Sequence, residues 1–127
     1  MQEVFSKLGP EYQPIIRNLA AEKLTSIEAL EMEVCDYMSE LEAAESQAEF
    51  LDVATALSIA YDCLELIESV NKLYSERRHL ALQVAIRYFV LEDDVESDES
   101  SIIGFDDDAE VVAIAKEFIT RTMATNE

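Results

Sequence analysis

Four aspartates in one acidic segment, residues 88–110, are the side chains of this sequence best suited to chemistry. The segment holds ten acidic residues and no basic residue. If the chain folds back on itself there, Asp94, Asp98, Asp107 and Asp108 form an oxygen-rich site. Such a site suits Mg²⁺ or Ca²⁺, because these hard cations prefer carboxylate and carbonyl oxygens. One hypothesis is therefore a divalent-metal-binding protein, either a sensor or an enzyme.

The same acids can also be explained without a metal. Asp106 or Asp107 can cap a last helix, and Glu110 can complete a capping box with Asp107, so that the negative charges favour the positive helix end. An EF-hand is not supported, because the residues before Gly104 are poor matches to the first ligand positions of its loop. The sequence leaves capping and metal binding open, and it predicts no other cofactor.

Other catalytic patterns are missing from the sequence. His79 is the only histidine, and it is expected to be a surface or partly packed residue rather than a catalyst. The sequence has no glycine-rich phosphate loop, no C-x-x-C and no H-E-x-x-H motif. Pairs of carboxylates carry little catalytic information in a chain this acidic. We therefore expect no catalytic residue and no enzyme.

Six residues of the acidic segment follow a recognisable spacing: Asp94, Asp98, Gly104, Phe105, Asp107 and Asp108. This spacing resembles that of the YkvA-like domain-of-unknown-function family, in which a helix ending in Tyr-Phe precedes D-x-I-P-D, an apolar run and G-Y-x-D-D. Ser97 stands where the family has proline, and residues 99–101 replace an apolar run. The resemblance covers about residues 75–120. It implies an all-helical fold and no reaction.

Composition predicts one all-α domain over residues 1–127. Half of the residues are hydrophobic, and the chain has two glycines and two prolines. Such a composition favours helices with short connections. We expect a single-domain helical bundle of about five helices. The expected helices span 13–23, from 27 to a break near 46, 48–73, 76–91 and 106–122.

Apolar spacing predicts the buried face of each helix. From Ile27 to Leu51 the apolar residues alternate at intervals of three and four, which is a heptad seam. A capping box with Thr25 as N-cap is expected at the start of this helix. The helix over 48–73 is the most apolar and is the candidate for the bundle centre, with Tyr61 among its buried residues. In the first and last helices the expected buried residues include Ile15, Ile16, Leu19, Val111, Ile114, Ala115 and Phe118.

Net charge narrows the classes of partner. The chain carries 28 acidic and 9 basic residues, a formal charge of -19. Direct nucleic-acid binding is not expected, because phosphates would be repelled. A basic protein would be attracted, although the charge could serve solubility alone. No base occurs between Lys23 and Lys72, so the acids beside the heptad seam are candidate contacts for such a partner: Glu31, Glu33 and Glu40.

Three apolar residues interrupt the acidic segment: Ile102, Ile103 and Phe105. They can fold down as a lid on the bundle, with Gly104 at a positive φ. Alternatively, they form an exposed apolar patch ringed by acids, which would suit a partner with a basic rim.

The functional prediction is a non-catalytic interaction module for a basic protein, such as an adaptor, an inhibitor or an immunity-type factor. Nucleic-acid mimicry is a further alternative, and self-association is left open. Cys35 and Cys63 are expected to be free, reduced thiols in the cytoplasm. The sequence shows no signal peptide and no uncharged stretch of the ~20 residues that a membrane-spanning helix needs, so no membrane contact is expected.

Overall fold

The computed structural model describes residues 2–44, 53–95 and 101–125. These ranges contain helices, turns and loops but no strand, which confirms the predicted all-α bundle. The elements are η1 (Gln2–Phe5), η2 (Pro10–Tyr12), α1 (Gln13–Ala20), α2 (Ile27–Ala44), α3 (Val53–Lys72), α4 (Glu76–Val95) and α5 (Ser101–Ala124).

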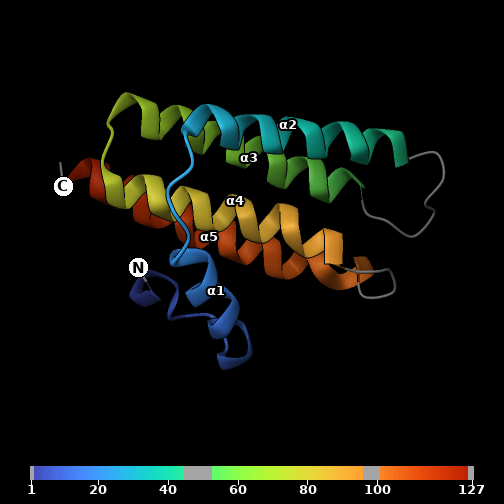
Figure 1. Cartoon of the computed structure of the whole chain (residues 1–127), viewed down its shortest axis with the longest axis horizontal. Helices are drawn as coiled ribbons and strands as arrows, with labels where there is room; N and C mark the ends of the chain where they lie inside the picture. The colour runs from blue at the N-terminus through green and yellow to red at the C-terminus, as the bar shows by residue number, and fades with distance from the viewer. Residues whose placement is uncertain (1, 45–52, 96–100, 126–127) are drawn as a thin grey trace.

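The helices are arranged in three layers (Figure 1). The antiparallel hairpin of α2 and α3 forms one layer, and the hairpin of α4 and α5 forms the second. Below the second layer, α1 packs on α4 and η1 packs on α5. The segment 21–26, here called the strap, leaves α1 and passes in front of α4 to reach α2.

The centre of the fold is α4, and not the third helix as the sequence predicted. Every residue from 81 to 86 is fully buried, because α1, α2, α3 and α5 enclose this helix. A helix that is covered on all sides must be apolar on nearly all faces. By contrast, α3 buries one face, formed by residues such as Ile59, Cys63 and Ile67, and leaves Tyr61 56% exposed. The expectation that Tyr61 is buried was wrong.

The heptad seam of α2 is confirmed over the part of the helix whose side chains are described. Leu30, Val34, Tyr37 and Leu41 are all buried within the bundle. The rest of the predicted seam and the predicted break near residue 46 lie outside the described residues. The cap is shifted by one position, because the Ser26 hydroxyl oxygen, 3.1 Å away, accepts the N–H of Ala29.

The N-terminal arm, residues 2–20, is anchored by four buried side chains: Phe5, Leu8, Ile16 and Leu19. Gln13 joins its two parts, because its Nε2 donates to the carbonyls of Phe5 at 3.1 Å and Leu8 at 3.2 Å. Ile15, expected inside, is 38% exposed, since α1 has only one side against α4.

The last two helices are longer than the sequence predicted. The predicted buried face of α5 is confirmed at Val111, Ile114, Ala115 and Phe118. However, α4 continues to Val95, and α5 begins at Ser101 instead of residue 106. Gly104 is therefore helical, and the predicted turn with a positive φ was wrong. A helix interior tolerates a glycine at a cost of about 1 kcal/mol, so the residue does not have to end a helix.

The two cysteines have different environments. Cys35 is exposed on α2, whereas Cys63 is buried in α3. Burial, followed by the negative charges of Asp62 and Asp108, raises the pKa of the Cys63 thiol to about 12. A thiol of this kind stays protonated and is inert, because the thiolate is the nucleophile.

We expect a thiol-reactive disulfide reagent at about pH 8 to modify one cysteine of the folded protein quickly and both cysteines in denaturant. Absorbance of the released thiol measures the stoichiometry. The Cys35→Ser variant is the control and should lose the fast phase. Two fast equivalents in the native protein would contradict the burial of Cys63.

Candidate functional site

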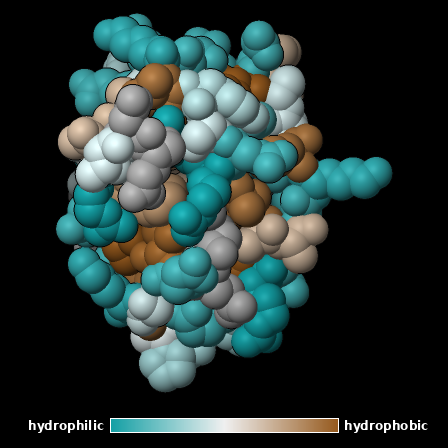
Figure 2. Space-filling model, turned by 90° about the vertical axis from the view of Figure 1, so that its left-hand side faces the viewer, coloured by the Kyte–Doolittle hydropathy of each residue, from teal (hydrophilic) through white to brown (hydrophobic). Residues whose placement is uncertain are grey.

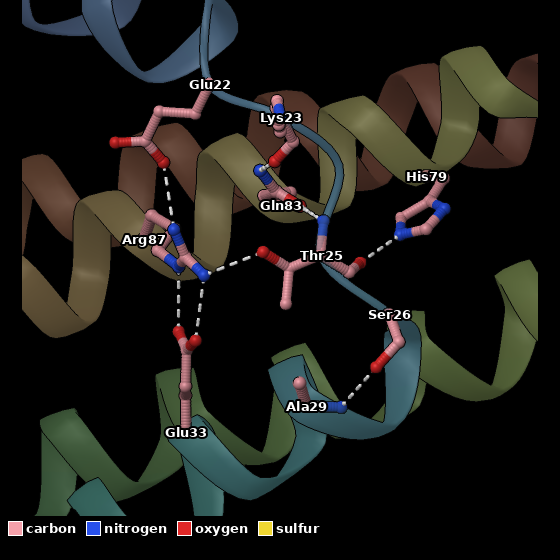
Figure 3. Close-up of polar contacts among 9 residues, drawn as sticks. All are labelled: Glu22, Lys23, Thr25, Ser26, Ala29, Glu33, His79, Gln83 and Arg87. Carbon is pink, nitrogen blue, oxygen red and sulfur yellow. Dashed lines mark hydrogen bonds and ion pairs between the residues drawn. The ribbon is translucent and has the colours of Figure 1, made fainter.

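A group of hydrogen-bonded polar side chains holds the strap against α4. His79, Gln83 and Arg87 are spaced four residues apart on α4, so they lie on one face, and this face is turned to the strap (Figure 3). We call these three residues, with their strap partners, the clasp. All three belong to the part of α4 that packs against α1, α2, α3 and α5.

Gln83 satisfies two main-chain groups of the strap. Its Oε1 accepts the N–H of Thr25 at 2.7 Å, and its Nε2 donates to the carbonyl of Lys23 at 2.9 Å. Gln83 is fully buried, so these bonds replace water for both of its ends. A side chain without this pair of groups would leave the strap main chain unpaired.

His79 is buried and uses both ring nitrogens, in contrast to the partly packed residue expected from the sequence. Its Nε2 lies 2.7 Å from the Thr25 carbonyl, and its Nδ1 lies 2.8 Å from the Tyr74 hydroxyl. A carbonyl oxygen only accepts, so Nε2 carries the proton and Nδ1 accepts from the tyrosine in the neutral ring. In this arrangement the ring positions the strap.

Arg87 is the hub of the clasp. Its Nε and Nη2 form a bidentate pair with the two carboxylate oxygens of Glu33, both at 2.9 Å. Its Nη1 donates to Glu22 at 2.8 Å, and Nη2 also donates to the Thr25 hydroxyl at 3.0 Å. The hydrogen bonds to Glu33 are the largest cause of a raised Arg87 pKa. Arg87 thereby links α2, α4 and the strap.

The three arginines of α4, Arg77, Arg78 and Arg87, could each bridge to an acidic helix face. Arg87 does so through Glu33. Arg77 pairs with Glu3 of η1 at 3.5 Å, while the buried Arg78 donates to the carbonyl of Leu73 at 2.9 Å. The three arginines therefore have three different partners, because their guanidinium groups are buried to different extents.

The predicted metal ligands do not sit on one folded-back loop. Asp94 is in the last turn of α4, and Asp107 and Asp108 are in α5, where consecutive residues diverge by about 100°. Asp108 is buried, and its charge acts on Cys63 of α3, so it is directed to the bundle interior. Asp98 lies outside the described residues, as do the side chains of Asp94 and Asp107. Within the described side chains, no group of three or more His, Cys, Asp or Glu residues is placed to hold a metal ion.

The capping alternative also changes with the longer α5. Asp106, Asp107 and Glu110 lie inside the helix, so the predicted N-cap and capping box at these residues were wrong. The backbone at Ile102, Ile103 and Phe105 is helical too, and their side chains lie outside the described part of the structure. The choice between a lid and an exposed patch therefore stays a matter for experiment.

The predicted partner-binding acids of α2 fall into two classes. Glu31 and Glu40 are exposed. Glu33, with a side chain 31% exposed, is held by Arg87. Glu33 differs because the Arg87 side chain of α4 lies opposite it, at 2.9 Å from both of its carboxylate oxygens.

Charge is divided along the long axis of the bundle (Figure 1). At the end where α3 finishes, α4 begins and α5 finishes, the helix termini carry the bases Lys72, Arg77 and Arg121 together with the acid Glu76. At the opposite end, acids occupy the last turn of α4 at 92–94 and the early part of α5 at 106–108. Over the whole chain, acids outnumber bases 28 to 9. The bases at this end therefore offset only a small part of the negative charge.

Two shallow cavities lie at the end of the bundle that carries Lys72, Arg77 and Arg121, one on each side of Arg77. One, of about 150 Å³, is lined in part by Ser75, Phe118 and Thr122, and the other, of about 240 Å³, by Leu24 and Leu80 among others. Figure 2 looks onto this end and shows apolar surface between polar side chains. The Arg77 guanidinium lies 5.4 Å from the centre of the Phe118 ring, which is the range of a cation–π contact.

Comparisons of the chain with protein-family models, with curated proteins and with solved structures find no match. Among the described residues, no helix is both long enough and apolar enough to cross a membrane.

Proposed function

We propose that this protein is a non-catalytic interaction module that docks a basic protein partner on the outer surface of the α2–α3 hairpin. The observation that carries this proposal is the unbalanced charge of the hairpin. Residues 24–71 contain twelve acids and no base. Of those with described side chains, Glu33 alone forms an ion pair inside the structure.

The remaining acids of the hairpin surface are not required by the fold. Seven are exposed and have no ion-pair partner among the described residues: Glu28, Glu31, Asp36, Glu40, Glu42, Glu65 and Glu68. Several stand three or four residues apart on one helix, such as Glu28 with Glu31 and Asp36 with Glu40. Like charges at this spacing cost about 0.2–0.5 kcal/mol per pair. A partner with lysine and arginine side chains would remove this repulsion and would also be attracted from a distance.

The proposal includes a cytoplasmic location, in which the two thiols stay reduced. It also keeps the resemblance of residues 75–120 to the YkvA-like family, which implied an all-helical fold. Neither the cytoplasmic location nor the resemblance specifies a reaction. The role is that of an adaptor, an inhibitor or an immunity-type factor, for which the partner supplies the activity.

The test is affinity purification from the native host at low and at high ionic strength, followed by mass spectrometry. The wild-type protein should retain a basic protein at low salt and release it at high salt, since exposed charges are screened. The Glu31→Gln/Glu40→Gln variant should bind that protein about tenfold more weakly, because each exposed charge pair contributes up to about 1 kcal/mol.

A matched control removes the same charge elsewhere. Glu11 and Glu110 are exposed and lie outside the hairpin, so the Glu11→Gln/Glu110→Gln variant should bind like the wild type. Equal weakening by both double variants would show an effect of net charge alone and would contradict docking on the hairpin. So would capture that does not depend on salt.

A further inference from the structure

Large apolar side chains are exposed at five places in the described part of the structure: Ile15, Leu24, Met32, Tyr61 and Tyr74. The two most exposed, Met32 at 64% and Tyr61 at 56%, both belong to the α2–α3 hairpin. Single exposed apolar residues are common on protein surfaces and need no explanation. The informative feature is that these two lie on the surface where the unpaired acids are also found.

Both residues point away from the bundle. Met32 is two positions from the buried Leu30, and Tyr61 is two positions from the buried Ile59, which on a helix is more than half a turn. The two helices are neighbours in an antiparallel hairpin, so each of the two side chains is exposed on the outer side of a helix of the same hairpin.

Carboxylates bracket Met32 on both sides and flank Tyr61 on one side. Glu28 and Asp36 stand four residues before and four residues after Met32, and Glu65 stands four residues after Tyr61. Side chains four residues apart are neighbours on a helix surface. All three acids are exposed and form no ion pair among the described residues. An apolar centre with a charged rim is the anatomy of a protein–protein interface.

We propose that Met32 and Tyr61 are the apolar anchors of the partner site and that the occupant is an amphipathic helix with lysine or arginine on both sides of its apolar stripe. This proposal rests on the function proposed above and adds the shape of the partner. Two antiparallel helices present a surface on which a third helix packs. Methionine adapts its shape to a partner, and tyrosine provides a large, rigid contact.

Charge complementarity selects this occupant over others. A second copy of the chain would bring the acids of one hairpin against the same acids of the other. A nucleic acid would set phosphates against them. A helix whose flanks are basic places cations beside Glu28, Asp36 and Glu65 while its stripe covers Met32 and Tyr61.

The experiment uses two synthetic peptides of identical leucine and lysine composition. In the first, leucines recur at intervals of three and four to form a stripe, and in the second the order is scrambled so that no stripe exists. Isothermal titration at fixed ionic strength gives the dissociation constant of each peptide for the full-length protein. The wild type should bind the striped peptide at least tenfold more tightly than the scrambled one.

The Met32→Ser/Tyr61→Ser variant should lose this preference and bind both peptides equally weakly. The matched control, Ile15→Ser/Leu24→Ser, removes two exposed apolar side chains outside the hairpin and should keep the preference. Circular dichroism checks that each variant keeps its helices. Equal, salt-dependent binding of both peptides by the wild type would overturn the anchors and leave acidic docking standing. Binding of neither peptide would overturn both proposals.

Discussion

Replacing Arg87 by alanine should lower the free energy of unfolding by about 2–3 kcal/mol. Removal of one partner from a buried ion pair costs about 3–5 kcal/mol, and we discount this value because water reaches part of the site. The Arg87 side chain is 19% exposed and that of Glu33 is 31% exposed. The variant loses the bidentate pair and the contacts to Glu22 and Thr25, and it leaves two carboxylates near each other without a cation. Urea denaturation followed by circular dichroism measures the loss.

A control variant and a double-mutant cycle separate the Arg87–Glu33 interaction from general charge effects. Arg77 pairs with Glu3 at 3.5 Å, and both side chains are largely exposed, so Arg77→Ala should change stability by no more than about 0.5 kcal/mol. In a double-mutant cycle, Arg87→Ala should cost much less in a Glu33→Ala background than in the wild type. A similar cost in both backgrounds would mean that the clasp does not depend on this pair.

Replacing Phe89 by alanine should cost about 3–5 kcal/mol. Phe89 is fully buried in the central helix, and its ring meets that of Tyr37 edge-on with the centroids 4.9 Å apart. The substitution removes a large apolar side chain from water-free surroundings, and it leaves a cavity between α2 and α4 that rigid helices cannot close. Denaturation curves at equal protein concentration give the change.

Tyr37→Phe is the matched control, because it keeps the ring and removes only the hydroxyl. That hydroxyl is buried and has no hydrogen-bond partner among the described residues. Its removal should leave stability unchanged or raise it by about 1 kcal/mol, since an unpaired buried polar group is costly. If Tyr37→Phe destabilised the protein as much as Phe89→Ala, the aromatic contact would not be the source of the effect.

Periodicity predicted the helices that bury a single face. The stripes of α2 and of the later part of α5 repeat every three or four residues, and both are buried as expected. The sequence did not identify α4 as the central helix, because the charged residues at both of its ends and its polar clasp face make it less apolar than α3. Periodicity failed for Tyr61 because α3 carries apolar residues on two faces and only one of them meets the bundle. Gly104 misled the prediction of the α5 start, since glycine weakens a helix without forbidding it.

The clasp could have been suspected from the sequence, but its partners could not. His79, Gln83 and Arg87 recur every four residues, with mainly apolar residues between them, which is a visible signal. Their strap partners are more than fifty residues earlier in the chain, and only the packing of α1 against α4 brings the strap to them. The same packing places Glu33 against Arg87. Nothing in the sequence distinguishes Glu33 from Glu31 and Glu40.

The clasp has a consequence for the order in which the protein acquires its structure during synthesis. A ribosome releases the arm and the strap well before Arg87, because the two parts of the clasp are 54 to 65 residues apart. Until α4 and α5 emerge, the arm lacks the two helices on which α1 and η1 pack in the folded protein. The α2–α3 hairpin joins neighbouring segments and can pair early. The first residues to be translated are thus among the last to reach their native contacts.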